Sequence, residues 1–283
     1  NVGKSSLFNA LSRAKANVSN YPFCTIDPNV GMVEVPDERL LKLTDLFKSK
    51  KTVPTFVEFY DIAGLVAGAS KGEGLGNQFL SHIREVDAIA HVVRCFKNAD
   101  IVHVAGSVDP QRDIDVINLE LTLSDLSQIE KRISSVGSKA RSGDKKLLKE
   151  LEVLEKVKQA LSAGTPVRKI NLEESEKEFV KGFSLLTGKP ILYVANVDES
   201  GNLDEVKKVE EIAKADGAKV ITISSKLESE LAELSKEEAK AYLQEFGMAE
   251  SALDKLIRSG YELLDLITFF TAGEKESRAW TVR

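Results

Sequence analysis

The chain has 283 residues and a net charge of −5, and 42% of its residues are hydrophobic and 29% are charged. This length and apolar content allow one or two domains with a substantial core, and the acidic balance argues against binding nucleic acid through a broad basic face. No apolar run reaches the roughly 18 residues of a membrane-spanning helix, and no signal peptide opens the sequence. Two widely separated cysteines, Cys24 and Cys95, fit a reducing compartment. We therefore expect a cytoplasmic protein with no membrane partner and no sequence-specific DNA partner.

The first hundred residues alternate between helical and extended patterns. In chain order they predict a helix over 5–13, a strand over 31–35, a helix over 37–47, a strand over 55–60 and a buried strand over 88–95. Two later apolar runs, 190–195 and 220–224, repeat the pattern of a strand that is buried on both faces. Strands that alternate with helices favour an α/β fold with a mostly parallel sheet flanked by helices.

The middle of the chain has a different pattern, with two apolar stripes at helical spacing on either side of a polar stretch. The stripes run over 119–133 and 147–161, and the polar stretch over 134–146 contains glycine. This pattern predicts an antiparallel helical hairpin. Asn171 and Glu174 have the spacing of a capping box and are expected to start a further helix.

The predicted hairpin interrupts the predicted α/β domain. We expect it to be an insertion over about 111–189, and we expect the α/β domain to consist of 1–110 and 190–273. No internal repeat or low-complexity tract in the sequence points to another arrangement.

The first six residues, NVGKSS, match the second half of the phosphate-loop motif G-x-x-x-x-G-K-[ST]. In such a loop, backbone N–H groups surround the phosphates and the positive end of the next helix faces them. Lys4 is expected to neutralise charge on the β- and γ-phosphates, and the Ser5 hydroxyl is expected to bind Mg²⁺. For this half motif taken alone, a chance Gly-Lys-Ser is the alternative.

Two further segments at suitable spacings support the phosphate site. Asp61-Ile-Ala-Gly64 places Asp-x-x-Gly at the end of a predicted strand, where Asp61 can hold the magnesium shell and the Gly64 N–H can contact the γ-phosphate. Between these motifs, the loop PFCTID places Thr25 where a switch threonine would complete the metal shell. Together the three segments predict a P-loop nucleoside triphosphatase of the GTPase-like class.

The residue that would orient the attacking water differs from the glutamine of Ras-like and Gα enzymes. Leu65 directly follows Gly64, and its side chain cannot orient water. His82 lies on a predicted helix that follows a glycine-rich run over 69–76, and it is the candidate for positioning water or transferring a proton. The alternative for His82 is a solvent-facing helix histidine.

The run YVANVDES lies where guanine-binding proteins have Asn-Lys-x-Asp at the end of a buried strand. Asn196 is present, but Val197 stands at the Lys position and Glu199 at the Asp position. Backbone N–H and C=O groups near Val197 could meet N1 and the N6 amine of adenine, whereas a carboxylate would face a lone pair there, at a cost of roughly 1–3 kcal/mol. These changes favour adenine, and a Glu199 that still reaches guanine is the alternative.

Several runs of the sequence resemble the Obg-like ATPase (YchF) family of P-loop proteins related to translation factors. They are NVGKSSLFNAL, YPFCTIDPNVG, DIAGLVAGASKGEGLGNQFL, DAIAHVVRCF and FFTAGEKESRAWT. The resemblance covers essentially the whole chain and implies a nucleotide-binding domain interrupted by a helical hairpin, with 274–283 leading into a C-terminal TGS domain that the sequence lacks. It also implies a preference for ATP over GTP and an association with the ribosome or a ribosomal subunit.

The same resemblance implies roles for individual residues. The residues implied to hold the phosphates are Asn1, Val2, Gly3, Lys4, Ser5 and Ser6. Ser5 and Thr25 would bind Mg²⁺, beside the Asp61 that the motif indicates. His82 would act in hydrolysis, together with the Lys4 and Gly64 that the motifs indicate. On the base side, Asn196 would brace the loop, Val197 would read adenine through its backbone, and Ser225 would belong to the loop that closes over the nucleotide. Asn1 would help to hold a K⁺ ion that substitutes for an arginine finger.

Two hypotheses from different classes follow. The first is a slow, Mg²⁺-dependent ATPase that cycles between ordered and loose switch loops. The second is a nucleotide-gated binding module whose hydrolysis is incidental and whose hairpin docks a large partner. Basic residues at the expected hairpin tip favour the second, although a solvated loop is the plainer interpretation of Lys139, Arg141, Lys145 and Lys146. A GTPase remains an alternative within the first class.

Overall fold

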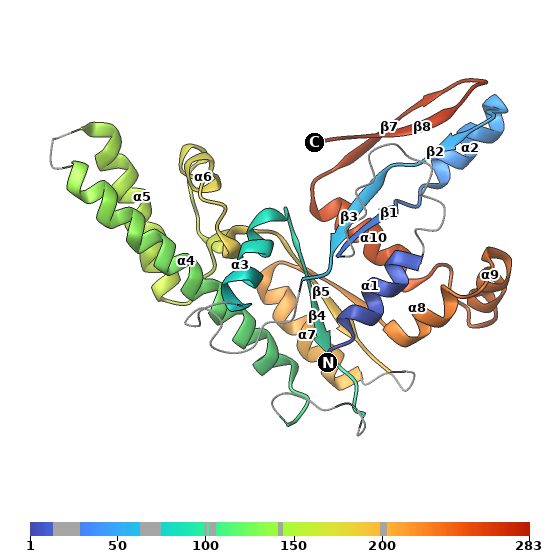
Figure 1. The fold of residues 1–283 in the computed structure, drawn as a ribbon, viewed down its shortest axis with the longest axis horizontal. Helices are drawn as coiled ribbons and strands as arrows, with labels where there is room; N and C mark the ends of the chain where they lie inside the picture. Colours follow the sequence, from blue (N-terminus) through green and yellow to red (C-terminus); the bar gives the residue numbers. More distant parts are fainter. Residues whose placement is uncertain (14–28, 63–74, 99–100, 102–105, 141–143, 199–202) are drawn as a thin grey trace. The chain divides into compact units, whose positions relative to one another are not determined.

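The computed structural model describes residues 1–13, 29–62, 75–98, 101, 106–140, 144–198 and 203–283. The chain divides into two compact units (Figure 1). The first unit comprises Asn1–Asp61, Ala90–Pro110 and Ile191–Arg283, and the second comprises Ile62–Ile89 and Gln111–Pro190. No helix among the described residues is long and apolar enough to cross a membrane.

The first unit alternates strands with helices, as the sequence predicts. Its helices are α1 (Lys4–Arg13), α2 (Glu38–Phe47), α7 (Leu203–Asp216), α8 (Ser225–Leu231), α9 (Lys236–Glu245) and α10 (Ala252–Leu263). Its strands are β1 (Val30–Glu34), β2 (Thr52–Val53), β3 (Phe56–Tyr60), β4 (Ile89–Arg94), β5 (Ile191–Asn196), β6 (Lys219–Ile223), β7 (Ile267–Ala272) and β8 (Ser277–Val282), with β4 starting at the boundary between the units. The strands expected over 31–35, 55–60, 88–95, 190–195 and 220–224 are confirmed within one or two residues.

The strands form three small sheets in the described part of the chain. β4, β5 and β6 lie in that order, and β5 runs parallel to β6. β1 pairs with β3 in antiparallel register, and β8 lies between β2, which is parallel to it, and β7, which is antiparallel. Both α7 and α10 contact β5 and β6, and every residue of β5 is buried. β5 is therefore the central strand that the continuous apolar run predicts.

The core of the first unit joins the first helix of the chain to the strands that end near it. Leu7, Ala10 and Leu11 of α1 pack with apolar side chains from β1, β3, β5, β6 and α10. Helix α1 buries these residues at helical spacing and leaves its first turn partly exposed. This packing places the N-terminal end of α1 close to the ends of the central strands, because Gly3 lies beside Asn196 of β5.

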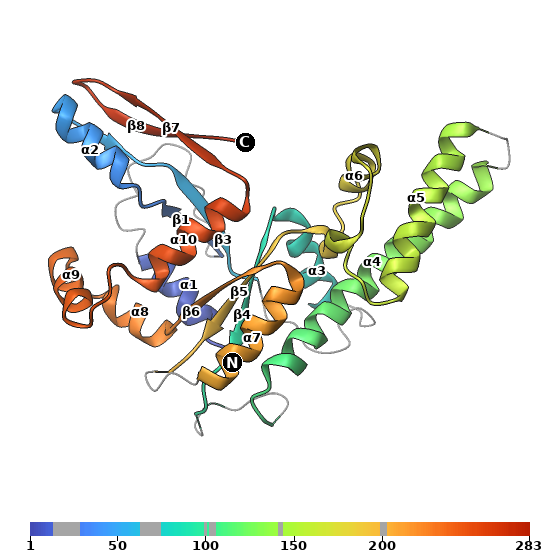
Figure 2. The ribbon, with the colours of Figure 1, turned by 180° about the vertical axis from the view of Figure 1, so that it is seen from behind.

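The second unit is helical. It contains α3 (Leu75–Glu85), α4 (Pro110–Ala140), α5 (Lys145–Ser162), α6 (Glu174–Lys181) and two short 3₁₀ turns, η2 (Val167–Lys169) and η3 (Leu186–Gly188). α4 and α5 run side by side in Figures 1 and 2, as the hairpin prediction requires. Their shared core contains Ile129, Val136, Leu154 and Val157.

The start of α6 differs from the expectation. The predicted cap was Asn171 with Glu174, but the helix begins at Glu174, and its capping box joins Glu173 to Glu176. Leu172, just before this box, is buried in the hairpin core. Burial of that leucine fixes where the chain turns into the helix, so the second of two overlapping capping patterns is used.

Helix α3 belongs to the same unit as the hairpin. Leu80 and Ile83 of α3 are buried against Leu121 of α4 and Leu186 of η3. The unit that contains the predicted insertion over 111–189 therefore also contains the described residues of 62–89.

Candidate functional site

The predicted phosphate loop runs into helix α1, and its conformation depends on Gly3. This residue has φ of +91°, a backbone conformation that residues with a Cβ rarely adopt. A Cβ at this position would also collide with the side-chain amide of Asn196 and would lie 2.8 Å from Ser225 Oγ. A glycine is therefore required at position 3 for two reasons, its positive φ and the close approach of the Asn196 and Ser225 side chains.

Asn196 connects the loop to the segment that follows β6. It is the last residue of β5 and is 1% exposed. Its Nδ2 donates to the Val2 carbonyl at 2.8 Å, and its Oδ1 accepts from the Ser225 N–H at 3.0 Å. The structure thus brings together Val2, Gly3, Asn196 and Ser225, four of the residues that the sequence assigns to nucleotide binding.

The neighbouring Val197 has its amide engaged within the protein. Its N–H donates to the Ile223 carbonyl at 2.9 Å, continuing the pairing of β5 with β6. The Val197 N–H itself therefore already has an acceptor within the protein, and the expected contact between a backbone N–H near Val197 and adenine N1 stays a prediction. The Val197 carbonyl has two lone pairs and is a hydrogen-bond acceptor for a base. Glu199 lies outside the described residues.

Lys4 and Asp61 form an ion pair at the start of α1 and the end of β3. Lys4 is the first residue of α1, and Asp61 is held by its N–H, which donates to the Asn29 carbonyl at 2.8 Å. The ion pair places the predicted phosphate lysine and the predicted magnesium aspartate in one locus. A lysine cannot contact this carboxylate and a phosphate with full strength at once, so nucleotide binding would compete with the pair.

The predicted metal ligands are only partly within the described residues. The side chain of Ser5 is exposed on the first turn of α1, and Asp61 is partly buried close to that turn through its contact with Lys4. A hydroxyl and one carboxylate are hard oxygen donors of the type that Mg²⁺ uses together with phosphate oxygens and water. Thr25 and Gly64 lie outside the described ranges. Within the described residues there is no cluster of three His, Cys, Asp or Glu side chains that could hold an ion without a phosphate.

His82 lies on α3 in the second unit, where its side chain is exposed to solvent. The structure therefore gives His82 the accessibility that a role in proton transfer requires, and this exposure equally fits the alternative of a surface histidine. The role of His82 remains a prediction.

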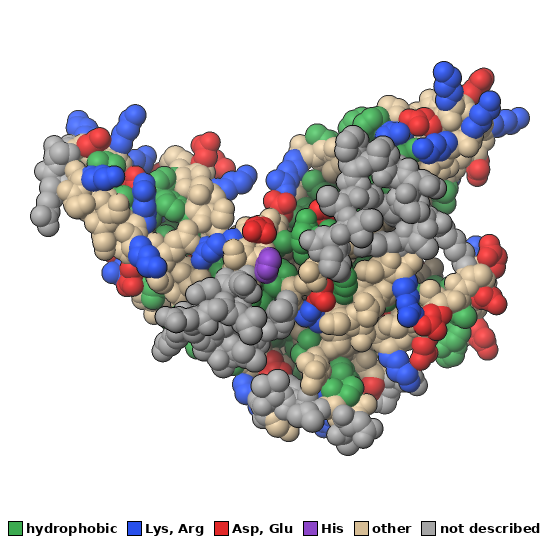
Figure 3. All heavy atoms as spheres, in the orientation of Figure 1, with side chains coloured by type: hydrophobic (Ala, Val, Ile, Leu, Met, Phe, Trp, Pro, Cys, Tyr) green, Lys and Arg blue, Asp and Glu red, His purple; other side chains and the backbone are tan. Residues whose placement is uncertain are grey.

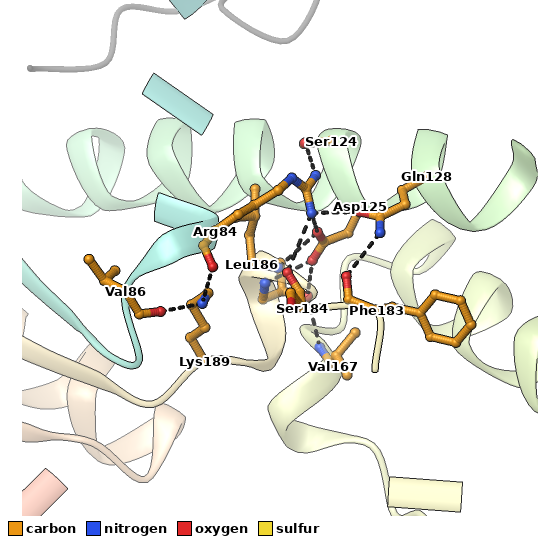
Figure 4. A network of polar contacts seen from close by, with 11 residues as sticks. Arg84, Val86, Ser124, Asp125, Gln128, Val167, Phe183, Ser184, Leu186 and Lys189 are labelled. Atoms are coloured by element: carbon orange, nitrogen blue, oxygen red, sulfur yellow. Dashed lines mark hydrogen bonds and ion pairs between the residues drawn. The ribbon is translucent and has the colours of Figure 1, made fainter. Parts of the chain in front are cut away.

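A network of polar contacts anchors the C-terminal end of α3 (Figure 4). Arg84 donates to Gln128 Oε1 at 2.5 Å and to Ser124 Oγ at 2.9 Å, both on α4. Lys189 donates to the carbonyls of Arg84 and Val86, at the end of the helix. Lysine is favourable at a helix C-terminus because it bonds to carbonyls that lack a partner within the helix. The helix that carries His82 is thus fixed to α4 at one end.

The centre of this network is a buried carboxylate. Asp125 is fully buried on α4, and its Oδ1 accepts from the Leu186 N–H at 2.9 Å. Its Oδ2 accepts from the N–H and the hydroxyl of Thr187, both at 2.8 Å. Burial raises the pKa of Asp125, while the hydrogen bonds from Thr187 and Leu186 and the charge of Arg84 oppose that rise.

Sequence reasoning missed Arg94, the last residue of β4. This arginine is 2% exposed, and its guanidinium donates to backbone carbonyls of Phe96, Asn1, Asn98 and Ile101. The available signal was a cation that closes an otherwise apolar strand, because a buried arginine needs hydrogen-bond partners. The next residue, Cys95, is also buried, and burial raises the pKa of its thiol to about 12, so the thiol is not a nucleophile at neutral pH.

Charge is mixed over the surface. On the face shown in Figure 3, Lys and Arg side chains are interspersed with Asp and Glu side chains in both units. On this face the two signs of charge are mixed, which is consistent with the net charge of −5.

Comparison with known proteins assigns the chain to a family. The family model described as "50S ribosome-binding GTPase" matches residues 1–139. The "Ribosome-binding ATPase YchF" of Bacillus subtilis (strain 168) is 56% identical over 289 residues, which cover 100% of this chain and 79% of that protein. The protein of the same name from Escherichia coli O157:H7 is 51% identical over 284 residues, covering 100% of this chain and 78% of that protein. The chain belongs to the YchF family.

A solved structure supports the YchF assignment. The structure titled "Structure of the Schizosaccharomyces pombe YchF GTPase" superposes with a TM-score of 0.89 at 40% identity, covering 100% of this chain and 78% of that chain. The α/β P-loop fold with a helical hairpin is thereby confirmed. The printed names of these YchF proteins differ in the nucleotide, since the bacterial ones are called ATPases and the yeast one a GTPase.

Proposed function

We propose that this protein is a Mg²⁺-dependent nucleoside triphosphatase that binds and slowly hydrolyses ATP in preference to GTP. The observation that carries the proposal is the convergence of three motifs in the first unit. Asn196 holds the Val2 carbonyl and the Ser225 amide, while Lys4 at the end of the same loop meets Asp61. The loop that we propose to contact phosphate, the proposed base-side brace and the proposed magnesium ligand are therefore joined by these contacts, which supports the proposal.

The chain's own oxygen ligands fit Mg²⁺. Ser5 and Asp61 would bind the ion together with Thr25, and the ion would neutralise charge on the phosphates when bound. Lys4 would leave Asp61 to bind phosphate, so the loss of the ion pair accompanies nucleotide binding. Asn1, in the same loop, would help to hold a K⁺ ion near the same phosphates.

The preference for adenine rests on the groups that remain for base contacts. With its N–H donated to Ile223, Val197 offers its carbonyl, which accepts a hydrogen bond but cannot donate one. Adenine presents its N6 amine where guanine presents the O6 oxygen, and an oxygen facing that carbonyl would cost about 1–3 kcal/mol as an unsatisfied pair. Val197 also removes the lysine stem that guanine-binding sites place along the base.

Competition between nucleotides tests the base preference. We expect Mg²⁺-ATP to bind roughly tenfold more tightly than Mg²⁺-GTP, the ratio that 1.4 kcal/mol gives. Isothermal titration of each nucleotide, and displacement of one by the other, measure this ratio. Tighter binding of GTP would contradict the adenine proposal and would leave the GTPase alternative.

Hydrolysis is proposed to depend on His82. Replacing His82 with Ala should lower ATP turnover by about 10²–10⁴-fold if the imidazole acts in proton transfer, while the Kd for ATP changes little. Ser81→Ala is the matched control, since Ser81 is exposed on the same helix. Turnover of His82→Ala equal to that of the control would remove His82 from the mechanism.

The switch is proposed to act at the ribosome in the cytoplasm. Support comes from the YchF relatives that are named as ribosome-binding. Lys139 and Lys145 flank the end of the helical hairpin and offer local positive charge. In the alternative function, a nucleotide-gated binding module, hydrolysis is incidental to docking. Co-sedimentation with ribosomes in ATP, in ADP and without nucleotide tests the switch, and equal binding in the three conditions would contradict it.

A further inference from the structure

Three consecutive carbonyls of the phosphate loop accept hydrogen bonds from three different elements. Arg94 at the end of β4 donates to the Asn1 carbonyl at 3.4 Å, and Asn196 at the end of β5 donates to the Val2 carbonyl at 2.8 Å. The Leu7 N–H of α1 donates to the Gly3 carbonyl at 3.0 Å. The backbone from Asn1 to Lys4 is therefore held peptide by peptide.

Holding a carbonyl also sets the direction of the next amide. A peptide group is planar and almost always trans, so each C=O points opposite to the N–H of the following residue. The bond to the Asn1 carbonyl thus orients the Val2 N–H, and the bond to the Val2 carbonyl orients the Gly3 N–H. In a phosphate loop, these backbone N–H groups are the ones that surround the phosphates.

The guanidinium of Arg94 is itself fixed by several contacts. Its Nε donates to the Phe96 carbonyl at 3.2 Å, and its Nη2 donates to the carbonyls of Asn98 and Ile101 at 3.3 and 3.1 Å. The group also stacks over the Phe96 ring, 4.5 Å from the ring centre. Because a guanidinium is planar and rigid, these bonds determine where Nη1 meets the Asn1 carbonyl.

We propose that Arg94 is a positioning residue for phosphate binding, which holds the Asn1–Val2 peptide group so that the Val2 N–H faces the bound phosphates. The proposal rests on the proposed function only in requiring that the loop binds phosphate, and it is independent of the base. Arg94 acts through the backbone of Asn1, from the side of the peptide group opposite to the amide.

A different role for Arg94 must be separated from this one. A buried cation near the loop could attract phosphate through its charge alone. Replacement of Arg94 with Lys separates the two roles, because lysine keeps the charge and loses the planar set of donors. A charge effect would survive this substitution, and a positioning effect would be lost.

The experiment compares the wild type with Arg94→Lys, Arg94→Gln and the control Arg278→Lys. Arg278 is a suitable control because it also stacks on an aromatic ring, that of Trp280 at 5.1 Å, and bonds to Glu276 on the β7–β8 hairpin. The Kd values for Mg²⁺-ATP, Mg²⁺-GTP and inorganic tripolyphosphate are measured by isothermal titration, and the melting temperature is measured without ligand. Tripolyphosphate has no base, so it reports on the phosphate loop alone.

We expect Arg94→Lys to weaken all three ligands by the same factor, roughly tenfold, as the loss of one charged hydrogen bond predicts. Arg278→Lys should bind them as the wild type does. Unchanged binding of tripolyphosphate by Arg94→Lys would overturn the proposal, whether or not ATP binding becomes weaker. If Arg94→Lys does not fold, Arg94→Gln, which keeps a single donor nitrogen, is measured instead, and wild-type binding by that variant would also overturn the proposal.

The outcome is distinguishable from failure of the proposed function. A wild type that binds GTP more tightly than ATP would end the adenine proposal, and the comparison of Arg94 variants would remain valid with GTP. A wild type that binds none of the three ligands would end both proposals.

Discussion

The phosphate loop of the first unit and the Asp125 network of the second unit are both built from buried polar groups, but they use backbone groups in opposite ways. In the loop, the side chain of Asn196 donates to the Val2 carbonyl. The Gly3 N–H of the same peptide group therefore points away from Asn196. In the second unit, Asp125 accepts from the amides of Leu186 and Thr187, and both of its oxygens are used. In the loop, the amides point away from the groups that hold it. In the second unit, the amides are hydrogen-bond donors to the carboxylate.

This difference separates the candidate phosphate site from a purely structural contact. Amides that point away from the donors holding their carbonyls are oriented as an anion site requires, and the positive end of a helix favours an anion beside them. A carboxylate with both oxygens satisfied within the core cannot bind a ligand, and it specifies how α4 meets η3 (Figure 4). Substitutions should therefore affect ligand binding in the first region and folding stability in the second.

The largest expected effect is that of Gly3→Ala on nucleotide binding. The added Cβ would collide with Asn196, and alanine would have to adopt the positive φ of residue 3. The loop must therefore move away from the geometry that holds its amides. We expect binding of tripolyphosphate and ATP to weaken at least about a hundredfold, equivalent to roughly 3 kcal/mol. Titration calorimetry measures this effect.

Gly217→Ala is the matched control for Gly3→Ala. Gly217 also has a positive φ, of +65°, but a Cβ there would meet no atom within 4 Å. The control carries the backbone strain without the collision, so it should lose some stability and keep wild-type ligand affinity. Equal loss of affinity in both variants would mean that a general loss of stability, rather than the collision with Asn196 at the loop, weakens binding.

Asp125→Asn tests the other side of the comparison. An amide keeps the shape of the side chain but turns one of its oxygens into a donor that faces the N–H of Leu186 or Thr187. We expect unfolding to become easier by about 1–3 kcal/mol, with nucleotide affinity unchanged while the variant is folded. Denaturation monitored by circular dichroism, together with titration of ATP, measures both quantities.

The control for Asp125→Asn is Asp115→Asn, because Asp115 is exposed on the same helix and bonds only to side-chain atoms of Gln111 among the contacts described here. Its stability should stay within about 0.5 kcal/mol of the wild type. A loss of ATP affinity in Asp125→Asn, with stability intact, would contradict the assignment of this network to structure.

Much of this organisation was predictable from the sequence, and the remainder depends on contacts between distant residues. Apolar periodicity located the strands and the hairpin helices, and the motif spacing located Lys4, Asp61 and Asn196. The β2–β8 pairing joins Thr52 to Ser277 through a strand of two residues, which is too short to show a pattern. Nor could Arg94 be assigned a partner, because the Asn1 carbonyl that it contacts is a backbone group with no signature in the sequence.

The base-side loop shows the same limit at a single residue. Asn196 could be proposed as a brace from its residue type and its place at the end of a predicted strand, and its side chain bonds to the backbone of Val2 and Ser225. Whether the Val197 amide is available depends on the register of β5 with β6, which residue spacing does not reveal. A backbone donor can therefore be predicted for a ligand only after the sheet register is known.

Glu228 is a buried carboxylate, like Asp125, but lies in the first unit, and its substitution should have the smallest effect on stability. It lies on α8 in the first unit, is 4% exposed, and accepts from the Ala252 N–H at 2.9 Å. Burial raises the pKa of Glu228, and the nearby charge of Asp254 adds to the rise, while bonds from Ala252 and Leu253 oppose it. Because the folded-state pKa is above the unfolded one, stability falls as the pH rises through the folded value and is regained as the pH falls toward the unfolded value.

Glu228→Gln keeps a carbonyl oxygen, whose two lone pairs can accept from the N–H groups of Ala252 and Leu253, and removes the buried charge. We therefore expect this variant to be more stable than the wild type at neutral pH, by about 1 kcal/mol or less, and the difference to shrink as the pH is lowered. Melting curves at several pH values measure this trend, with Glu230→Gln as the control because Glu230 is exposed on the same helix. A variant that is less stable at neutral pH would show that the charge of Glu228 stabilises the start of α10, as a carboxylate at a helix N-terminus does, and would place Glu228 with Asp125 as a structural acceptor.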